Sequence, residues 1–201
     1  MTQPERVFLL SPARCSGLRA ELLVHSPSAL GVALRGEGAP LGEVFAFLSS
    51  LYFRGKLAYA SRFAMHRPEL PGALIITPGH GLCRPNTRVR AADLAAIGLI
   101  EVDAQNPTFV GPLGRDAQLL ARTLGTGEVV LLGSIATPKY VDPLLAVFGE
   151  RLLFPREFVG RGDMSRGGMM LRASKSGVEL DYVPVQATVR KGKRATRLDQ
   201  L

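Results

Sequence analysis

Cysteines, long apolar runs and metal-binding motifs are all scarce in this sequence. Its two cysteines, Cys15 and Cys83, are too few for a disulfide framework, so we expect a reduced, cytoplasmic protein. No apolar run approaches the roughly 20 residues that a membrane span needs, and we expect no membrane partner. The N-terminus lacks a basic segment followed by a long apolar stretch, which argues against a secretory signal. Cys-x-x-Cys pairs are missing too, and we predict neither a metal nor a cofactor.

The charge balance favours an anionic partner. The formal net charge is +8, and cationic side chains bind nucleotides or nucleic acid by neutralising phosphates. Part of this charge lies in the stretch 190–197, which has no apolar periodicity and is typical of a solvated end. We therefore predict a single α/β domain over residues 1–187 and a basic, disordered tail over 188–201.

Four short apolar runs predict buried strands. They do not alternate between polar and apolar residues, as is typical of a parallel sheet covered on both faces, and they occupy 7–10, 73–77, 128–132 and 151–154. The segments between them have helical periodicity, over 44–64 with an interruption near Ser49 and Ser50, over 115–124, and over 138–148. This alternation predicts a three-layer α/β/α fold with a mainly parallel central sheet of four to five strands.

Other segments are less regular. We interpret 24–40 and 97–112, which are rich in glycine, proline or serine, as long excursions without regular structure. Residues 164–174 predict a helix capped by Asp163 or Ser165, or else one arm of a hairpin that turns at 174–177. Residues 178–185 predict a last strand at the edge of the sheet.

Polar segments follow all four predicted strands. They comprise residues 11–17, 77–82, 133–140 and 155–168. Because ligands of open parallel sheets bind beyond the carboxyl ends of the strands, we expect these segments to form one site.

The first segment has two interpretations. Arg14, Ser16 and Gly17 precede a predicted helix at Leu18 and can hold a phosphate at its N-terminus, or Ser16 simply caps that helix. The spacing does not match a Walker-type phosphate loop. Cys15 is either a nucleophile activated by the helix end or a buried structural cysteine.

Two residues are candidates for catalysis. His80, which lies between Gly79 and Gly81, can act as general acid or base, or can only hydrogen-bond in a tight turn. Asp163 can orient a water or stabilise developing positive charge, or can cap the following helix.

The remaining candidates are polar residues expected to contact substrate or phosphate. Arginine offers a planar fork of donors that suits phosphate, and glycine lets a ligand approach the backbone closely. The aliphatic stems of Arg54 and Lys56 can instead cover the edge of the core. These candidates are Ser11, Tyr52, Arg54, Lys56, Gly79, Ser134, Lys139, Tyr140, Arg161, Ser165 and Arg166.

These segments also carry a family likeness. The chain resembles a little-characterised bacterial family of small α/β domains of unknown function through residues 10–17, 51–60, 77–82, 131–134 and 154–168. More distantly, it is similar to the uracil-DNA-glycosylase superfamily, which implies a sheet whose strand ends receive a flipped-out nucleoside. The superfamily's Gly-x-Asp-Pro-Tyr loop is replaced here by 11–15, without a carboxylate, so the likeness implies the architecture rather than uracil excision.

We therefore predict an enzyme that acts on a nucleobase or nucleotide, free or within nucleic acid, by glycosidic cleavage or base modification. In this prediction Arg14, Ser16, Arg161 and Arg166 bind phosphate. The alternatives are a non-catalytic nucleic-acid-binding or adaptor protein that uses the basic tail, and an enzyme of small phosphorylated molecules.

Overall fold

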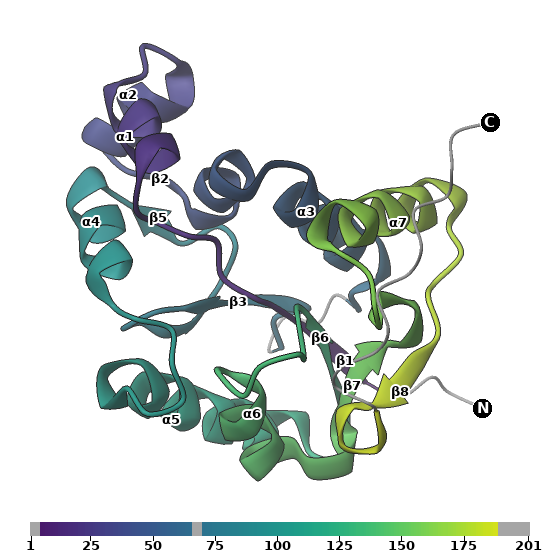
Figure 1. Cartoon of the computed structure of the whole chain (residues 1–201). Coiled ribbons are helices and arrows are strands. Elements are labelled where there is room, and N and C mark those ends of the chain that lie inside the picture. The colour runs from purple at the N-terminus through teal and green to yellow at the C-terminus, as the bar shows by residue number, and fades with distance from the viewer. Residues whose placement is uncertain (1–4, 66–69, 189–201) are drawn as a thin grey trace.

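Helices and strands are interspersed along the chain (Figure 1). The computed structural model describes residues 5–65 and 70–188. The strands are β1 (Arg6–Leu10), β2 (Ala39–Pro40), β3 (Ala73–Thr77), β4 (Gly81–Cys83), β5 (Arg88–Val89), β6 (Glu128–Leu132), β7 (Leu152–Pro155) and β8 (Tyr182–Pro184). The α-helices are α1 (Leu18–His25), α2 (Ala29–Arg35), α3 (Leu41–Phe63), α4 (Ala91–Leu99), α5 (Pro107–Leu124), α6 (Val141–Phe148) and α7 (Asp163–Ser176). Short 3-10 helices lie at Gly149–Arg151, Arg156–Phe158 and Val185–Ala187.

A six-stranded sheet runs through the molecule in the order β4-β3-β1-β6-β7-β8. Strands β3, β1, β6 and β7 are mutually parallel, and the edge strands β4 and β8 are antiparallel to their neighbours. The α/β class with a mainly parallel sheet is therefore confirmed, with one strand more than we predicted. The additional strand is β4, whose three residues are too few to show a pattern in the sequence.

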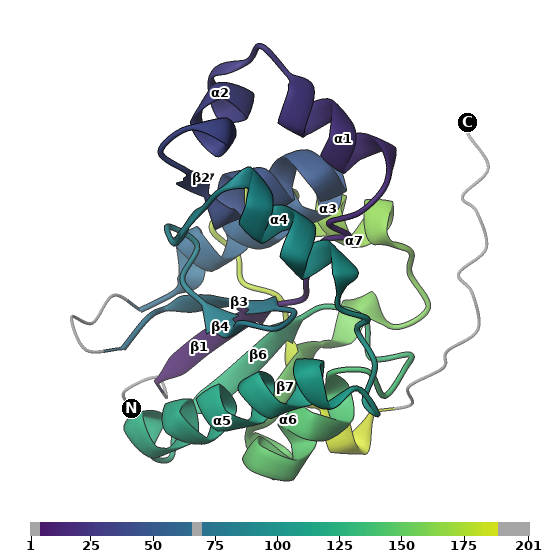
Figure 2. The same cartoon turned by 90° about the vertical axis from the view of Figure 1, so that its left-hand side faces the viewer.

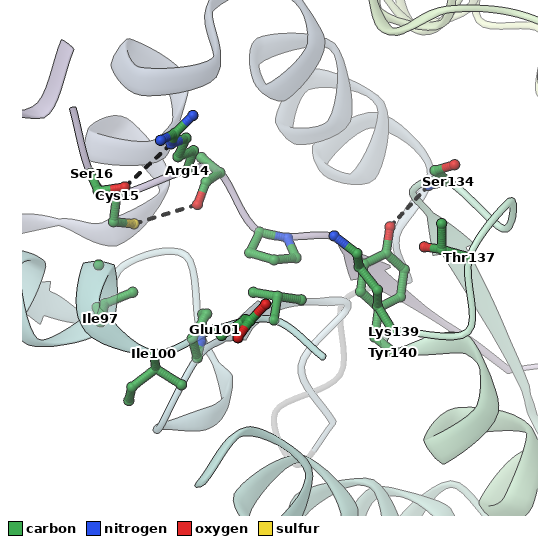
Figure 3. A pocket seen from close by; sticks show the side chains of 15 residues that line it. Arg14, Cys15, Ser16, Ile97, Ile100, Glu101, Ser134, Thr137, Lys139 and Tyr140 are labelled. Carbon is green, nitrogen blue, oxygen red and sulfur yellow. Dashed lines mark hydrogen bonds between the residues drawn. The ribbon is translucent and has the colours of Figure 1, made fainter. Parts of the chain in front are cut away.

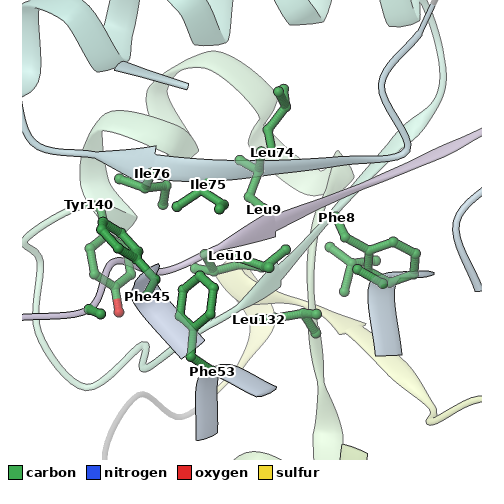
Figure 4. Close-up of a cluster of buried hydrophobic side chains, with 14 of the residues drawn as sticks. Phe8, Leu9, Leu10, Phe45, Phe53, Leu74, Ile75, Ile76, Leu132 and Tyr140 are labelled. Atoms are coloured by element: carbon green, nitrogen blue, oxygen red, sulfur yellow. The ribbon is translucent and has the colours of Figure 1, made fainter. Parts of the chain in front are cut away.

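Helices cover both faces of this sheet. Helices α3 and α7 pack on one face, whereas α5 and α6 pack on the other, and α1, α2 and α4 lie beyond one end of the strands (Figures 1 and 2). The central strands are buried on both faces, which explains their unbroken apolar sequences. Figure 4 shows Phe8, Leu9 and Leu10 of β1 packed among side chains of neighbouring strands and of α3.

The two segments expected to be irregular are largely helical. Helix α1 reaches His25, and α2 follows after Ser28, whose side chain accepts the Gly31 N–H as an N-cap. Helix α5 begins at Pro107, where Asn106 caps it through the Thr108 N–H. Our prediction for 24–40 and 97–112 was wrong, because serine, asparagine and proline act there as signals for helix starts rather than for loops.

The C-terminal region resolves two alternatives. Residues 163–176 form helix α7 rather than a hairpin, and the helix ends at Gly177, whose φ of 71° suits glycine. The predicted caps were wrong: Gly162 precedes α7 and Gly17 precedes α1, and neither helix has a side-chain cap. The predicted interruption near Ser50 is confirmed, since α3 leaves helical geometry at that residue (φ 50°).

Within the described residues, every helix falls short of the length and apolar character that a membrane crossing requires. Apart from Thr188, the predicted basic tail lies outside the described residues.

Candidate functional site

A pocket of about 470 Å³ lies at the topological switch point of the sheet, beside the end of β1. The chain leaves β1 and returns to the sheet as β3 on one side, whereas β6 and β7 extend the sheet on the other side. Ligands of doubly wound sheets bind at this switch point, beyond the carboxyl ends of the strands. The lining comes from the segment after β1, the end of α4, the turn after β3 and the segment after β6. It comprises Pro12, Ala13, Arg14, Cys15, Ser16, Pro78, Ile97, Gly98, Ile100, Glu101, Val102, Ser134, Thr137, Lys139 and Tyr140, and we call it the edge pocket (Figure 3).

The edge pocket combines an apolar wall with a few charges. Arg14 and Lys139 are its two exposed cations and Glu101 is its exposed carboxylate. The Nε of Arg14 donates to Ser16 Oγ at 3.3 Å, which orients the guanidinium beside the pocket. Apolar surface with a few polar groups around it is typical of a site for small ligands.

A group of polar side chains adjoins this pocket through Tyr140; all of them are buried except that of Asp163, which is 67% exposed. Its members are Ser11, Tyr52, Lys56, Tyr140, Asp163 and Arg166, and we call it the Lys56 cluster. Lys56 is only 1% exposed. Its Nζ lies 2.7 Å from Ser11 Oγ and 3.0 Å from the Ser11 carbonyl oxygen, and 4.0 Å from the centre of the Tyr52 ring. Burial lowers the pKa of Lys56 to about 7; the negative charge of Asp163 opposes this shift and the positive charge of Arg166 adds to it.

Two glycines let α3 and α7 approach closely enough to form this cluster. A Cβ on Gly55 would lie 2.7 Å from the carbonyl oxygen of Gly167. A Cβ on Gly167 would lie 2.8 Å from the Leu51 carbonyl oxygen and 2.9 Å from Tyr52 Cα. Both contacts involve backbone atoms, which cannot move aside. The glycine at 167 therefore serves helix packing, not the anion loop that we predicted for this segment.

Arg166 is held inside the protein by this packing. Its side chain is 9% exposed, its Nε donates to the Phe158 carbonyl oxygen at 3.1 Å, and its Nη1 lies 3.7 Å from Asp163 Oδ1. Tyr52 Oη is buried and makes no hydrogen bond of ordinary geometry among the described residues, although the Arg166 guanidinium interacts with it. A buried hydroxyl in this state is a polar atom that a ligand or a water can satisfy.

Tyr140 links the Lys56 cluster to the pocket. Its Oη accepts the Ser134 N–H at 3.1 Å, and its hydroxyl also interacts with the Ser11 side chain. A Cβ on Gly133 would lie 3.0 Å from both Ser11 Oγ and Tyr140 Oη, so the missing side chain lets these two hydroxyls share one space. Burial raises the pKa of Tyr140, which keeps the phenol protonated at neutral pH.

The structure brings most of the predicted site residues together. Those that line the edge pocket are Arg14, Cys15, Ser16, Ser134, Lys139 and Tyr140, and those in the Lys56 cluster are Ser11, Tyr52, Lys56, Asp163 and Arg166, besides Tyr140. Gly79 packs against Ile100 of the pocket wall. The candidates that line neither are Gly17, Arg54, His80, Arg161 and Ser165.

His80 and Arg166 do not lie where we expected them. Strand β3 turns directly into β4, and the His80 N–H donates to the Thr77 carbonyl oxygen, so His80 is exposed on a tight hairpin. Arg166 is buried and bonded to backbone rather than open to a phosphate. The catalytic roles of His80 and Asp163 stay predictions, and neither residue lines the pocket.

Cys15 fits the structural interpretation. It is 7% exposed, and its Sγ lies 3.5 Å from the Ala13 carbonyl oxygen. Burial raises the pKa of Cys15 to about 12, so the thiol is neutral at physiological pH. A neutral thiol is a weak nucleophile.

Sequence reasoning missed Glu101 and the wall from Ile97 to Val102. We interpreted this stretch as an excursion, and it is instead the end of α4 and the segment that follows. This stretch packs against Cys15 through a tertiary contact that the sequence does not reveal: a Cβ on Gly98 would lie 2.8 Å from the Cys15 carbonyl oxygen. The available signal in the sequence was the carboxylate of Glu101 close to the apolar residues Ile97, Ile100 and Val102.

Comparison of the chain with models of known families, with curated proteins and with solved structures gave no match.

Proposed function

We propose that this protein is an enzyme that binds a nucleobase or nucleotide, free or within nucleic acid, in the edge pocket, and cleaves its glycosidic bond or modifies its base. The observation that carries the proposal is the pocket itself: two cations, one carboxylate and an apolar wall at the switch point of a doubly wound sheet. Its volume of about 470 Å³ lies within the range of small-molecule sites. We also propose an architecture of the uracil-DNA-glycosylase type, which the mainly parallel sheet supports.

The lining suggests a role for each part of such a ligand. Ile97, Ile100 and Val102 offer an apolar surface for the flat face of a base. Arg14 and Lys139 supply positive charge for a phosphate. Glu101 is the carboxylate available to stabilise the positive charge that develops on a sugar as a glycosidic bond breaks.

Binding is tested by thermal unfolding with nucleotides, free bases and short oligonucleotides. A ligand at about 100 times its Kd stabilises the native state by about 2.7 kcal/mol. For a chain of this length, that is a rise in Tm of roughly 5–10 °C. Arg14→Ala and Lys139→Ala should each weaken phosphate binding by roughly 10- to 100-fold, since each removes a charge-assisted hydrogen bond. Arg122→Ala, an exposed arginine on α5, is the matched control.

Catalysis is tested by chromatography of released or altered base. Glu101→Gln should abolish the reaction while leaving ligand-induced stabilisation in place. Glu150→Gln, an exposed carboxylate of the 3-10 helix Gly149–Arg151 outside the pocket, should change neither the reaction nor the stabilisation. If no nucleotide, base or oligonucleotide raises the Tm of the wild type, the proposal is refuted. Binding without turnover in any of these substrates would favour the alternative of a non-catalytic nucleic-acid-binding protein.

A further inference from the structure

Lys56 is a buried amine without a carboxylate partner. Among the described residues, none places a carboxylate oxygen within 4.0 Å of its Nζ, and Asp163 acts on it only at longer range. Burying an unpaired ammonium is strongly unfavourable, so the protein stabilises the neutral amine. Arg166, itself buried, adds a second cation to the same region.

A neutral amine at this position can take a proton from Ser11. Nζ of Lys56 donates to the Ser11 carbonyl oxygen at 3.0 Å and to Ser11 Oγ at 2.7 Å. When the amine is neutral, its lone pair can replace the second donation and accept the Ser11 hydroxyl proton across the same 2.7 Å contact. Serine with an adjacent lysine as base is a recurring arrangement in hydrolases. The contact is therefore the geometry of a nucleophile and its base.

Ser11 is 5% exposed and lies beside the edge pocket without being part of its lining. It follows the last residue of β1, and the next residue, Pro12, lines the edge pocket. Its Oγ shares the space beside Gly133 with Tyr140 Oη, and Tyr140 lines the same pocket. The Tyr140 hydroxyl interacts with the Ser11 side chain, and Arg166 supplies positive charge to the same region, so negative charge that develops on a substrate carbonyl oxygen beside Ser11 has two sources of stabilisation.

We propose that Ser11 is a nucleophile that attacks acyl carbonyl carbons in the edge pocket, with Lys56 as its general base. As the bond from Oγ to the carbonyl carbon forms, the hydroxyl proton moves to Lys56 Nζ. The bond from that carbon to the leaving group then breaks, and Lys56 returns the proton to the leaving group. Water next attacks the acyl ester on Ser11 and gives a proton to Lys56; as the ester bond breaks, Lys56 passes this proton to Ser11 Oγ, and a carboxylic acid leaves. This activity goes beyond the nucleotide proposal because it requires neither a base nor a phosphate.

A fluorophosphonate ester tests the proposal, because an activated serine displaces its fluoride and keeps the phosphonyl group. Wild-type protein at pH 8 should gain one adduct, which peptide mass spectrometry should locate at Ser11. Ser11→Ala should gain none. Lys56→Met should react at least about 100-fold more slowly, because about 100-fold is the lower end of what general-base catalysis contributes. Lys175→Met, an exposed lysine of α7, should react as the wild type does.

Circular dichroism and cooperative urea unfolding establish that each variant is folded. Should Lys56→Met fail to fold, the pH dependence of wild-type labelling decides the question. The rate should rise through about pH 7 and level off above about pH 8.5, as the neutral fraction of Lys56 does. Other groups that face Lys56 are Tyr52, Tyr140, Asp163 and Arg166; burial raises the pKa of both tyrosines, so they keep their protons in this range.

Several results would overturn the proposal: no adduct on the wild type, an adduct at another residue, equal labelling of folded Lys56→Met, or a rate that still increases tenfold per pH unit above about pH 9. None of these outcomes bears on nucleotide binding, which is measured by Tm. Failure of one proposal is therefore distinguishable from failure of the other.

Discussion

Replacing Lys56 by methionine should remove a rise in stability with pH. Burial lowers the pKa of Lys56 to about 7 in the folded protein, whereas an unfolded lysine titrates near 10.4. Between these two values the unfolded chain binds more protons than the native state does. The free energy of unfolding therefore increases with pH in this window, is lowest below about pH 7, and levels off above about pH 10.4.

The size of the effect follows from the two pKa values. Between about pH 6.5 and about pH 9.5, the linkage relation predicts that the contribution of Lys56 to the free energy of unfolding rises by roughly 3 kcal/mol. The steepest slope is about 1.4 kcal/mol per pH unit. Methionine has no proton to bind, so Lys56→Met loses this contribution. It also loses two hydrogen bonds to Ser11, each worth about 1 kcal/mol, but that loss does not vary with pH.

Urea unfolding of both proteins at several pH values is the assay. The difference in free energy of unfolding, wild type minus Lys56→Met, should increase by roughly 3 kcal/mol across the range, while Lys175→Met should follow the wild type. Tyr52, Tyr140, Asp163 and Arg166 are present in all three proteins and cancel in the comparison. Parallel curves for wild type and Lys56→Met would show that Lys56 titrates as an ordinary lysine, and the argument for a neutral amine would fail.

Other predictions concern the cysteines and the glycines of α7. Cys15 should resist iodoacetamide at pH 8 in the native protein and react only in urea, because burial raises its pKa to about 12; native alkylation at Cys15 would contradict this, and peptide mass spectrometry reports it. Gly167→Ala should lower the free energy of unfolding by roughly 1–3 kcal/mol, since its Cβ would meet the backbone of α3. Gly168→Ala, whose Cβ would meet only the flexible end of Arg172, should raise it by about 0.5–1 kcal/mol. Equal effects in urea unfolding would refute the close helix contact.

The central strands could be predicted because they are buried on both faces. Such strands appear as unbroken apolar runs, and all four runs became parallel strands of the sheet. Because the carboxyl ends of parallel strands meet at one edge of the sheet, we expected the segments after all four strands to form one site. The segments after β1 and β6 do line one pocket, through Arg14 and Lys139 among others, whereas residues 155–168 do not line it. The burial of Lys56 also had a signal, because it follows Phe53 by three residues and precedes Ala60 by four, on the apolar face of α3.

The role of the glycine-rich segment could not be predicted in the same way. A glycine that lets a ligand approach and a glycine that lets a helix approach have the same sequence pattern, since both positions only require that a Cβ be absent. Gly167 belongs to the second kind, and only the position of Leu51 and Tyr52 shows it. His80 illustrates the same limit, because a polar segment after a strand can lead into a pocket or, as here, into a hairpin.

The Lys56 cluster lowers the free energy of unfolding relative to a well-packed apolar interior. Replacing a buried ionic group by well-packed apolar residues is often neutral or stabilising, so methionine at 56 with alanine at 11 would hold α3 against β1 adequately. The close contact at Gly167 instead places Arg166 near Lys56, where its charge lowers the pKa of the lysine further, and the side chain of Asp163 is 67% exposed and compensates only in part. The same interactions that reduce stability at neutral pH keep the amine free to accept a proton from Ser11. Protonation of Lys56 therefore governs both experiments. The free energy of unfolding should begin to rise at the same pH, near 7, at which the rate of fluorophosphonate labelling reaches half of its maximum. If these two pH values differed by more than about one pH unit, different groups would control stability and labelling, and Lys56 would not be the base.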